Sequence, residues 1–145
     1  MSVEEIKALM RRLIEEYNKG KAAAMAATDE LYAADFVYHG VGGEEIRGLE
    51  NIKQSESEGF NAFPDHHFTI DDLVVEGDKV ATRLTLTGTH TGEFMGIPPT
   101  HKKVTVWAMT ISRISGGKIA ESWEMMDTLD VIQQLGAIPK PEKET

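Results

Sequence analysis

The spacing of the apolar residues changes halfway along this 145-residue chain, from a helical period to a strand-like one. From Ser2 to Lys19 apolar residues recur at steps of three and four, which predicts an amphipathic helix. A second helix is expected from Lys21 towards Tyr32, and a third from Gly48 to Phe63, where Pro64 ends the pattern. Between these two helices, the aromatic and β-branched run 35–39 predicts a short strand.

The second half contains four long runs rich in β-branched and aromatic residues, which predict strands. These runs are Phe68–Glu76, Lys79–Thr89, Val104–Ile114 and Lys118–Asp127. Turn-forming residues join them in pairs as tight hairpins, and a last short helix is expected from Thr128 to Leu135. Helices followed by an antiparallel meander indicate one α+β domain over residues 1–138, with helices on one face of a curved sheet. Residues 139–145 are expected to form a charged tail.

Charge and composition exclude several classes of function. The chain has 15 Lys and Arg against 24 Asp and Glu, so it lacks the basic surface that binding to nucleic acids or anionic membranes requires. It has no Cys, which excludes disulfides, thiolate metal sites and cysteine nucleophiles. The five His show no metal-ligand spacing, and no nucleotide-binding glycine motif occurs. With no basic-then-apolar leader and no run of 18 apolar residues, a cytoplasmic protein without metal or organic cofactor is expected.

The last predicted hairpin carries large apolar residues on both of its faces. If its loop has two residues, Thr110 and Ser112 share a face with Glu121, Trp123, Met125 and Asp127. The opposite face then carries Trp107, Met109, Ile111, Ser122, Glu124 and Met126. A sheet that is covered on one side only would have one polar face. We therefore expect one face to line the interior and the other to meet a second copy of the chain in a homodimer.

Asp127 is the first candidate for chemistry, because it ends the last strand on the same alternating face as Trp123 and Met125. An Asp in apolar surroundings has a raised pKa and can transfer protons near neutrality. The alternative is that Asp127 caps the helix that begins at Thr128. Glu121 on the same face is either a second pocket carboxylate or a member of a structural ion pair.

His39, at the end of the short strand, and His90, in the segment 88–103, are candidates for hydrogen bonding or proton transfer, or else residues of the pocket rim. The segment 88–103 is too long for a tight hairpin, so it is expected either to fold over a cavity as a lid or to plug the open end of the sheet. Its apolar residues are Phe94, Met95 and Ile97. Tyr17 fits the core face of the first helix, and its hydroxyl could donate to an oxyanion in a cavity.

Several short motifs are spread over nearly the whole chain. They are Tyr38-His39, Ala62-Phe-Pro-Asp65, Val75-Glu-Gly-Asp-Lys-Val80, the segment 88–100, Gly117-Lys-Ile119, Glu121, Trp123, Asp127 and Gln133-Gln-Leu-Gly136. Together these motifs resemble the SnoaL-like polyketide cyclases, also called ester cyclases, of the NTF2-like superfamily. One departure is His101, which stands where the family usually has Gly.

This resemblance implies an α+β cone, often dimeric, in which N-terminal helices pack on a strongly curved antiparallel or mixed sheet and enclose a hydrophobic pocket. It implies cofactor-free aldol closure of a polyketide ring, with Asp127 as the acid/base group and with His39 and His90 at recurrent histidine positions. The expected ligand is a small, apolar, carbonyl-containing molecule. Its expected binding residues are Tyr17, Phe94, Met95, Ile97, Glu121, Trp123 and Met125.

Three functions stay open at this point. In the first, Asp127 removes a proton next to a carbonyl while Tyr17, His39 or His90 holds the enolate oxygen. The second keeps the pocket but carries out isomerisation, dehydration or epoxide opening, although the Arg-x-Asp arrangement of related epoxide hydrolases does not occur here. The third is a non-catalytic protein that binds a small apolar metabolite, because one scaffold can serve many tasks.

Overall fold

The structure is a computed structural model that describes residues 1–139, and it combines four α-helices with a six-stranded sheet. The helices are α1 (Val3–Asn18), α2 (Lys21–Leu31), α3 (Leu49–Ala62) and α4 (Thr128–Gln134). The strands are β1 (Tyr32–His39), β2 (Glu45–Arg47), β3 (His67–Glu76), β4 (Lys79–Thr89), β5 (Lys103–Ser115) and β6 (Lys118–Met126). A short 3-10 turn, η1 (Val41–Gly43), joins β1 to β2.

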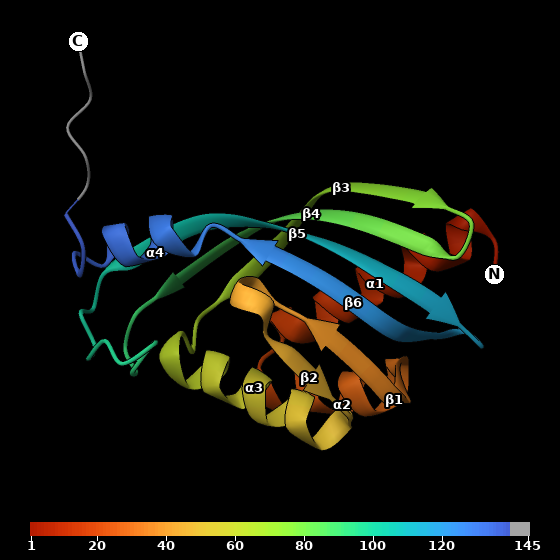
Figure 1. Ribbon diagram of the computed structural model, residues 1–145, viewed down its shortest axis with the longest axis horizontal. Coiled ribbons are helices and arrows are strands. Elements are labelled where there is room, and N and C mark those ends of the chain that lie inside the picture. Colours follow the sequence, from red (N-terminus) through yellow and green to blue (C-terminus); the bar gives the residue numbers. More distant parts are fainter. Residues whose placement is uncertain (140–145) are drawn as a thin grey trace, which may run out of the picture.

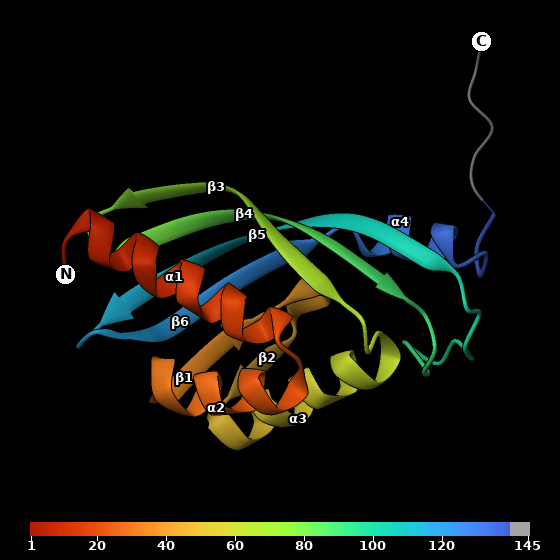
Figure 2. The same cartoon turned by 180° about the vertical axis from the view of Figure 1, so that it is seen from behind.

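The six strands form one mixed sheet in the order β2-β1-β6-β5-β4-β3. Strands β1 and β6 run parallel, and all other neighbours run antiparallel. Helices α1, α2 and α3 gather on one side of the curved sheet, while α4 continues from β6 at one end (Figures 1 and 2). The predicted α+β cone is therefore confirmed, as a sheet that stays open between its edge strands β2 and β3.

Local sequence explains the first helix and how it packs. Ser2 and Glu5 form a capping box, in which each side chain accepts a hydrogen bond from the backbone N–H of the other residue. The apolar stripe of α1 is buried against the layer formed by α2 and the sheet. The buried residues at the centre of this core are Ile6, Met10, Leu13, Ala27, Leu31, Phe36, Ile52, Val80, Ile114 and Ile119. A smaller cluster under α4 contains Val104, Val106, Val131 and Leu135.

Most predicted elements occur within a few residues of their expected bounds, with two differences in the region between α2 and α3. The short strand predicted at 35–39 begins at Tyr32, directly after α2, and a second short strand, β2, follows it. Apart from Pro139, the predicted tail lies outside the described residues. Among residues 1–139, no helix is long and apolar enough to cross a membrane.

The register of the β5–β6 hairpin differs from the expected one, and the difference decides which side chains point inward. Ile114 pairs with Ile119 as a two-residue loop requires, but Arg113 then pairs with Glu121, so Ala120 is an extra residue in a β-bulge. A shift of one residue exchanges the two faces of a strand. From the bulge onward, residues of β6 therefore lie on the opposite face from the predicted one.

The observed inner face of this hairpin carries small and polar side chains, and the outer face carries large apolar ones. Thr110 pairs with Glu124, and Ser112 pairs with Ser122, towards the helices. The outer face exposes Trp107, Met109, Ile111, Trp123 and Met125. The prediction of large apolar residues on both faces of this hairpin is therefore wrong, as is the predicted partnership of Thr110 with Trp123 and Met125, because the large apolar residues gather on the outer face.

Candidate functional site

Two adjoining cavities lie between the helices and the inner face of the sheet. Tyr17, Glu56, Phe68 and Leu86 line both of them, so the two form lobes of one interior space. The apolar lobe, under the end of α3 and the loop 90–102, has a volume of about 210 Å³. The polar lobe, between α1, β1 and β6, has a volume of about 230 Å³.

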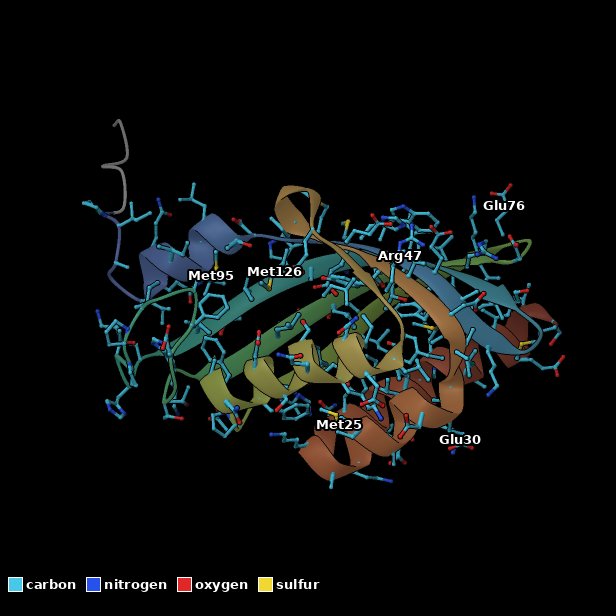
Figure 3. The ribbon with its side chains drawn as sticks, turned by 60° about the horizontal axis from the view of Figure 1, so that its bottom comes forward. Met25, Glu30, Arg47, Glu76, Met95 and Met126 are labelled. Carbon is cyan, nitrogen blue, oxygen red and sulfur yellow. The ribbon has the colours of Figure 1, made fainter. Side chains whose placement is uncertain are left out.

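Aromatic and aliphatic side chains form most of the wall of the apolar lobe. They include Phe60, Phe63, Phe94, Val104, Val106, Met126 and Val131. The loop 90–102 covers this lobe through Phe94, whose ring packs edge-on against Phe63 with centroids 5.4 Å apart. Figure 3 shows Met126 of β6 and Met95 of the loop at this end of the molecule, near α4. The predicted covering role of the loop is thus confirmed for Phe94.

The loop is held against the end of α3 by backbone contacts. The N–H groups of Thr91 and Gly92 both donate to the carbonyl oxygen of Ala62, at 3.0 and 3.2 Å. A Cβ atom on Gly92 would lie 2.0 Å from the carbonyl oxygen of Asn61, so only glycine allows this approach. The covering segment is therefore fixed to the helix layer at its first residues.

Glu124 brings a carboxyl group into the polar lobe from β6. The bulge at Ala120 turns its side chain inward, where it lies beside Tyr38 and lines the cavity. Burial raises the pKa of Glu124 above its ordinary value, and the nearby charge of Glu44 raises it further, while the neighbouring Tyr38 hydroxyl lowers it. Glu124 has the properties that the sequence analysis expected of Asp127, three residues further along the chain.

Glu56 brings a second carboxyl group from α3, where the two lobes meet. The Tyr17 hydroxyl donates to Oε1 of Glu56 at 2.5 Å, and the Thr28 hydroxyl lies 2.9 Å from each carboxyl oxygen. The Tyr17 and Tyr32 hydroxyls lie 3.4 Å apart. Burial raises the pKa of Glu56 despite these hydrogen bonds, and burial also raises the pKa of Tyr32 well above its usual range, which keeps this phenol protonated at neutral pH.

Asp127 does not occupy the interior. Its side chain is exposed and accepts a hydrogen bond from the Asp130 N–H at 3.1 Å, which caps α4. The expected inward orientation is therefore wrong, and the alternative reading as a helix cap is confirmed. The cause is the extra residue Ala120, which reverses the faces of β6 before Asp127 is reached.

The expected pocket residues of β6 lie on the outer face for the same reason, and His39 of β1 lies there beside them. His39 stacks on Trp123 with ring centroids 5.3 Å apart, and its Nε2 lies 2.7 Å from Oε2 of Glu121. Glu121 also accepts hydrogen bonds from Arg113, and its contacts with His39 and Arg113 lower its pKa. Met125 is 67% exposed beside this group. None of these side chains lines either lobe.

His90 is buried, and its hydrogen bonds hold the covering loop together. Its Nδ1 accepts the Thr100 backbone N–H at 3.1 Å and lies 3.0 Å from the Thr100 hydroxyl, so it ties the two ends of the covering loop together. Of the three apolar loop residues, Phe94 lines the apolar lobe, Ile97 packs against the cluster under α4, and Met95 is 66% exposed. Tyr17 and Phe94 are thus the predicted site residues that the structure places in the cavity walls.

Sequence reasoning missed Glu56, although a signal was present. Glu56 stands four residues after Ile52 and four before Phe60, on the buried stripe of α3. His66, also missed, lines the apolar lobe between the rings of Phe60 and Phe68, and burial lowers its pKa. Within residues 1–139, no group of three His, Asp or Glu side chains could hold a metal ion.

Comparison with known proteins gives one consistent family. A family model described as SnoaL-like polyketide cyclase matches residues 7–135. The aklanonic acid methyl ester cyclase DnrD of Streptomyces peucetius is 30% identical over 138 residues, which cover 92% of this chain and 93% of the relative.

Two solved structures illustrate the range of the fold. IdmH of Streptomyces antibioticus, described as a candidate polyketide cyclase, is 32% identical with a TM-score of 0.77 and matches 90% of this chain and 97% of its own. AclR of Streptomyces galilaeus, described as a candidate hydroxylase, is 29% identical with a TM-score of 0.83 and matches 98% of this chain and 87% of its own. Proteins with this architecture are thus described with more than one chemistry.

Proposed function

This chain belongs to the SnoaL-like polyketide cyclase family, and we propose that it closes a ring in a small, carbonyl-containing, polyketide-like molecule by proton transfer to and from its own side chains. The observation that carries the proposal is Glu124, an inward carboxyl with a raised pKa in the polar lobe. Next to it the apolar lobe offers a water-poor surface for the rest of a largely hydrophobic ligand. A few polar groups in an apolar cavity are typical of enzyme sites.

In this mechanism Glu124 is the base. Its carboxylate removes a proton from the carbon next to a carbonyl group of the ligand, and the raised pKa makes it a stronger base than an exposed carboxylate. The resulting enolate carbon attacks a second carbonyl of the same molecule and forms the new carbon–carbon bond. The attacked oxygen becomes an alkoxide and takes up a proton, so the product is an isomer of the substrate.

The tyrosines of the polar lobe stabilise the enolate. Tyr32 lines the lobe, and its raised pKa keeps its hydroxyl a hydrogen-bond donor throughout the reaction. Tyr38 lies beside Glu124 in the same lobe and can orient the base. A donor that is positioned before the reaction in a dry cavity contributes about 100-fold or more to the rate.

Turnover of a named polyketide tests this proposal. The name of the relative DnrD suggests aklanonic acid methyl ester as the substrate to test. The compound would be incubated with the protein, and the products would be separated and their masses measured by mass spectrometry. The proposal predicts a new compound of unchanged mass that forms in proportion to enzyme concentration. Tight binding of the compound with no isomer formed would contradict a cyclase of this substrate class and would favour a binding protein.

We also propose that two copies of the chain meet through the outer face of the sheet. Large apolar side chains crowd this face, and Trp107 and Met109 are 53% and 49% exposed. A shallow cleft of about 680 Å³ lies among them, bordered by His39 and Arg83. Exposed apolar patches of this kind mark interfaces, and a twofold axis would pair the same patch with itself.

A further inference from the structure

Glu56 is a buried carboxyl that the ring closure described above leaves without a task. Both of its oxygens contact hydroxyl groups, of Tyr17 and Thr28. Among residues 1–139 no Lys or Arg nitrogen lies within 4.0 Å of it, and Lys53 on the same helix pairs with Asp29 and Glu50 instead. A carboxyl group that is desolvated and lacks a cationic partner favours its protonated form. It is therefore suited to donate a proton.

The two interior carboxyls project from opposite walls of one space. Glu124 comes from β6 in the sheet, and Glu56 comes from α3 in the helix layer. Tyr32 lines the same lobe as both carboxyls, and its hydroxyl lies 3.4 Å from that of Tyr17, which contacts Glu56. A ligand between the walls would meet one carboxyl on each of its faces.

We propose that Glu56 is the acid of the ring closure and that Tyr17 relays its proton, an inference that rests on the proposed function of the same site. As the alkoxide forms, the Tyr17 O–H bond breaks and a new O–H bond forms on the ligand. When Glu56 is protonated, the 2.5 Å hydrogen bond between Tyr17 and Glu56 runs in the reverse direction: Glu56 donates to the Tyr17 oxygen, the Tyr17 O–H points to the ligand, and the Glu56 proton replaces the one that Tyr17 gives up. Glu56 is then a carboxylate and Glu124 carries the proton from carbon. Loss of that proton to solvent and uptake of another by Glu56 restore the starting state.

This division of roles predicts a bell-shaped pH dependence of ring closure. The rate rises as Glu124 ionises and falls as Glu56 loses its proton. The charged and titratable groups around Glu56 are Tyr17 on α1, Asp29 on α2, Tyr32 on β1 and Lys53 on its own helix. Asp29 raises the pKa of Glu56, and Lys53 lowers it.

Separate measurement of proton removal and ring closure tests the assignment. The substrate is aklanonic acid methyl ester in D2O. The rate of proton removal is the sum of the rate of deuterium incorporation into the substrate and the rate of ring closure, and the rate of ring closure is also reported by itself. Glu56→Gln is expected to keep proton removal within about twofold, to slow closure about 100-fold and to abolish the decline at high pH. Glu58→Gln, an exposed carboxyl on the same helix, is the matched control and should change neither rate.

The outcomes separate the two proposals. If Glu56→Gln closes the ring at the normal rate, or loses both activities equally, Glu56 is not the acid. If Glu124→Gln retains both activities, the proposed function itself fails, whatever Glu56 does. Glu56→Asp keeps a carboxyl group at this position and should recover part of the closure rate, which a purely structural role would not require.

A second measurement needs no substrate. The carboxyl carbon of Glu56 can be followed by NMR in protein labelled with 13C-glutamate and assigned by its loss in Glu56→Gln. Its titration midpoint should lie above 4.5 and should rise further in Tyr17→Phe, because the Tyr17 hydroxyl lowers the pKa. A midpoint at or below 4.5 would show that the site does not favour the protonated form of Glu56 and would overturn the assignment.

Discussion

Thr110 on β5 lies directly opposite Glu124 on β6, and this pairing places the Glu124 carboxyl inside the cone. The pairing exists because Ala120 forms a bulge between the hairpin turn and Glu124. If Ala120 paired with Arg113 instead of forming a bulge, Glu124 would face outward, and the apolar outer residues of β6 would face the helices. One extra residue therefore decides which carboxyl of β6 can act on a ligand.

Deletion of Ala120 tests what holds this register. Removing it lets Glu121 follow Ile119 directly, so that Arg113 still pairs with Glu121 and Thr110 still pairs with Glu124, without a bulge. We therefore expect Glu124 to stay inside the cone, and the free energy of unfolding in urea to change by no more than about 1 kcal/mol. Ala120→Ser keeps the chain length and is the control. A loss of about 3 kcal/mol or more on deletion would show that the bulge itself is required for this register.

The buried carboxyl of Glu124 should destabilise the folded state at neutral pH. Its folded pKa is raised, so the folded form binds the proton more tightly than the unfolded form does. That stabilisation is complete below the unfolded pKa, about 4.5, and is lost as the pH rises through the folded pKa. Glu124→Gln should therefore melt higher than the natural protein at pH 8, by about 3 °C, and the gap should close below pH 4.5. A gap that does not change with pH would contradict the buried charge.

We expect the dimer interface to lie on the outer face of the sheet. Met109→Lys places a charge at the centre of the exposed apolar patch, where a partner would have to bury it without a counter-ion. Light scattering after size exclusion should give a dimer for the natural protein and a monomer for this variant. Val3→Lys, an exposed apolar residue on α1, should remain dimeric. A natural protein that is monomeric at high micromolar concentration would refute the interface.

The attachment of the loop to α3 depends on Gly92. Gly92→Ala introduces a Cβ that would clash with the Asn61 carbonyl, so the loop must move away from the end of the helix. We expect a loss of about 1–3 kcal/mol in unfolding free energy and faster hydrogen exchange at the Thr91 amide. Gly59→Ala, which meets nothing within 4 Å and lies in α3, should be neutral or stabilising. Equal behaviour of the two variants would show that the loop is not held there.

Much of the fold could be predicted because its signals are local. The apolar period of α1 and the turn residues of the hairpins each act over a few residues, and both occur as expected. The apolar outer face, by contrast, differs from the expectation, since Trp107 and Trp123 lie on the same face rather than on opposite ones. The open mixed sheet adds the parallel pairing of β1 with β6, which depends on contacts distant in the sequence.

The site was predicted less well, because it depends on a register that no local signal specifies. Ala120 is an ordinary strand residue, and nothing in its neighbours marks a bulge. The error moved the expected acid/base residue from Glu124 to Asp127 and took Trp123 and Met125 to the wrong side of the sheet. By contrast, Tyr17 was placed correctly, since the helical period of α1 fixes its face.

The most direct test of the central claim compares two carboxyl groups, one within β6 and one just after its end. Glu124→Gln and Asp127→Asn each replace a carboxyl by an amide of the same shape, one inside the polar lobe and one exposed at the cap of α4. The rate of proton removal from aklanonic acid methyl ester would be measured for both. We predict a loss of about 100-fold or more for Glu124→Gln and less than about twofold for Asp127→Asn. The reverse order, or full activity in Glu124→Gln, would contradict the account.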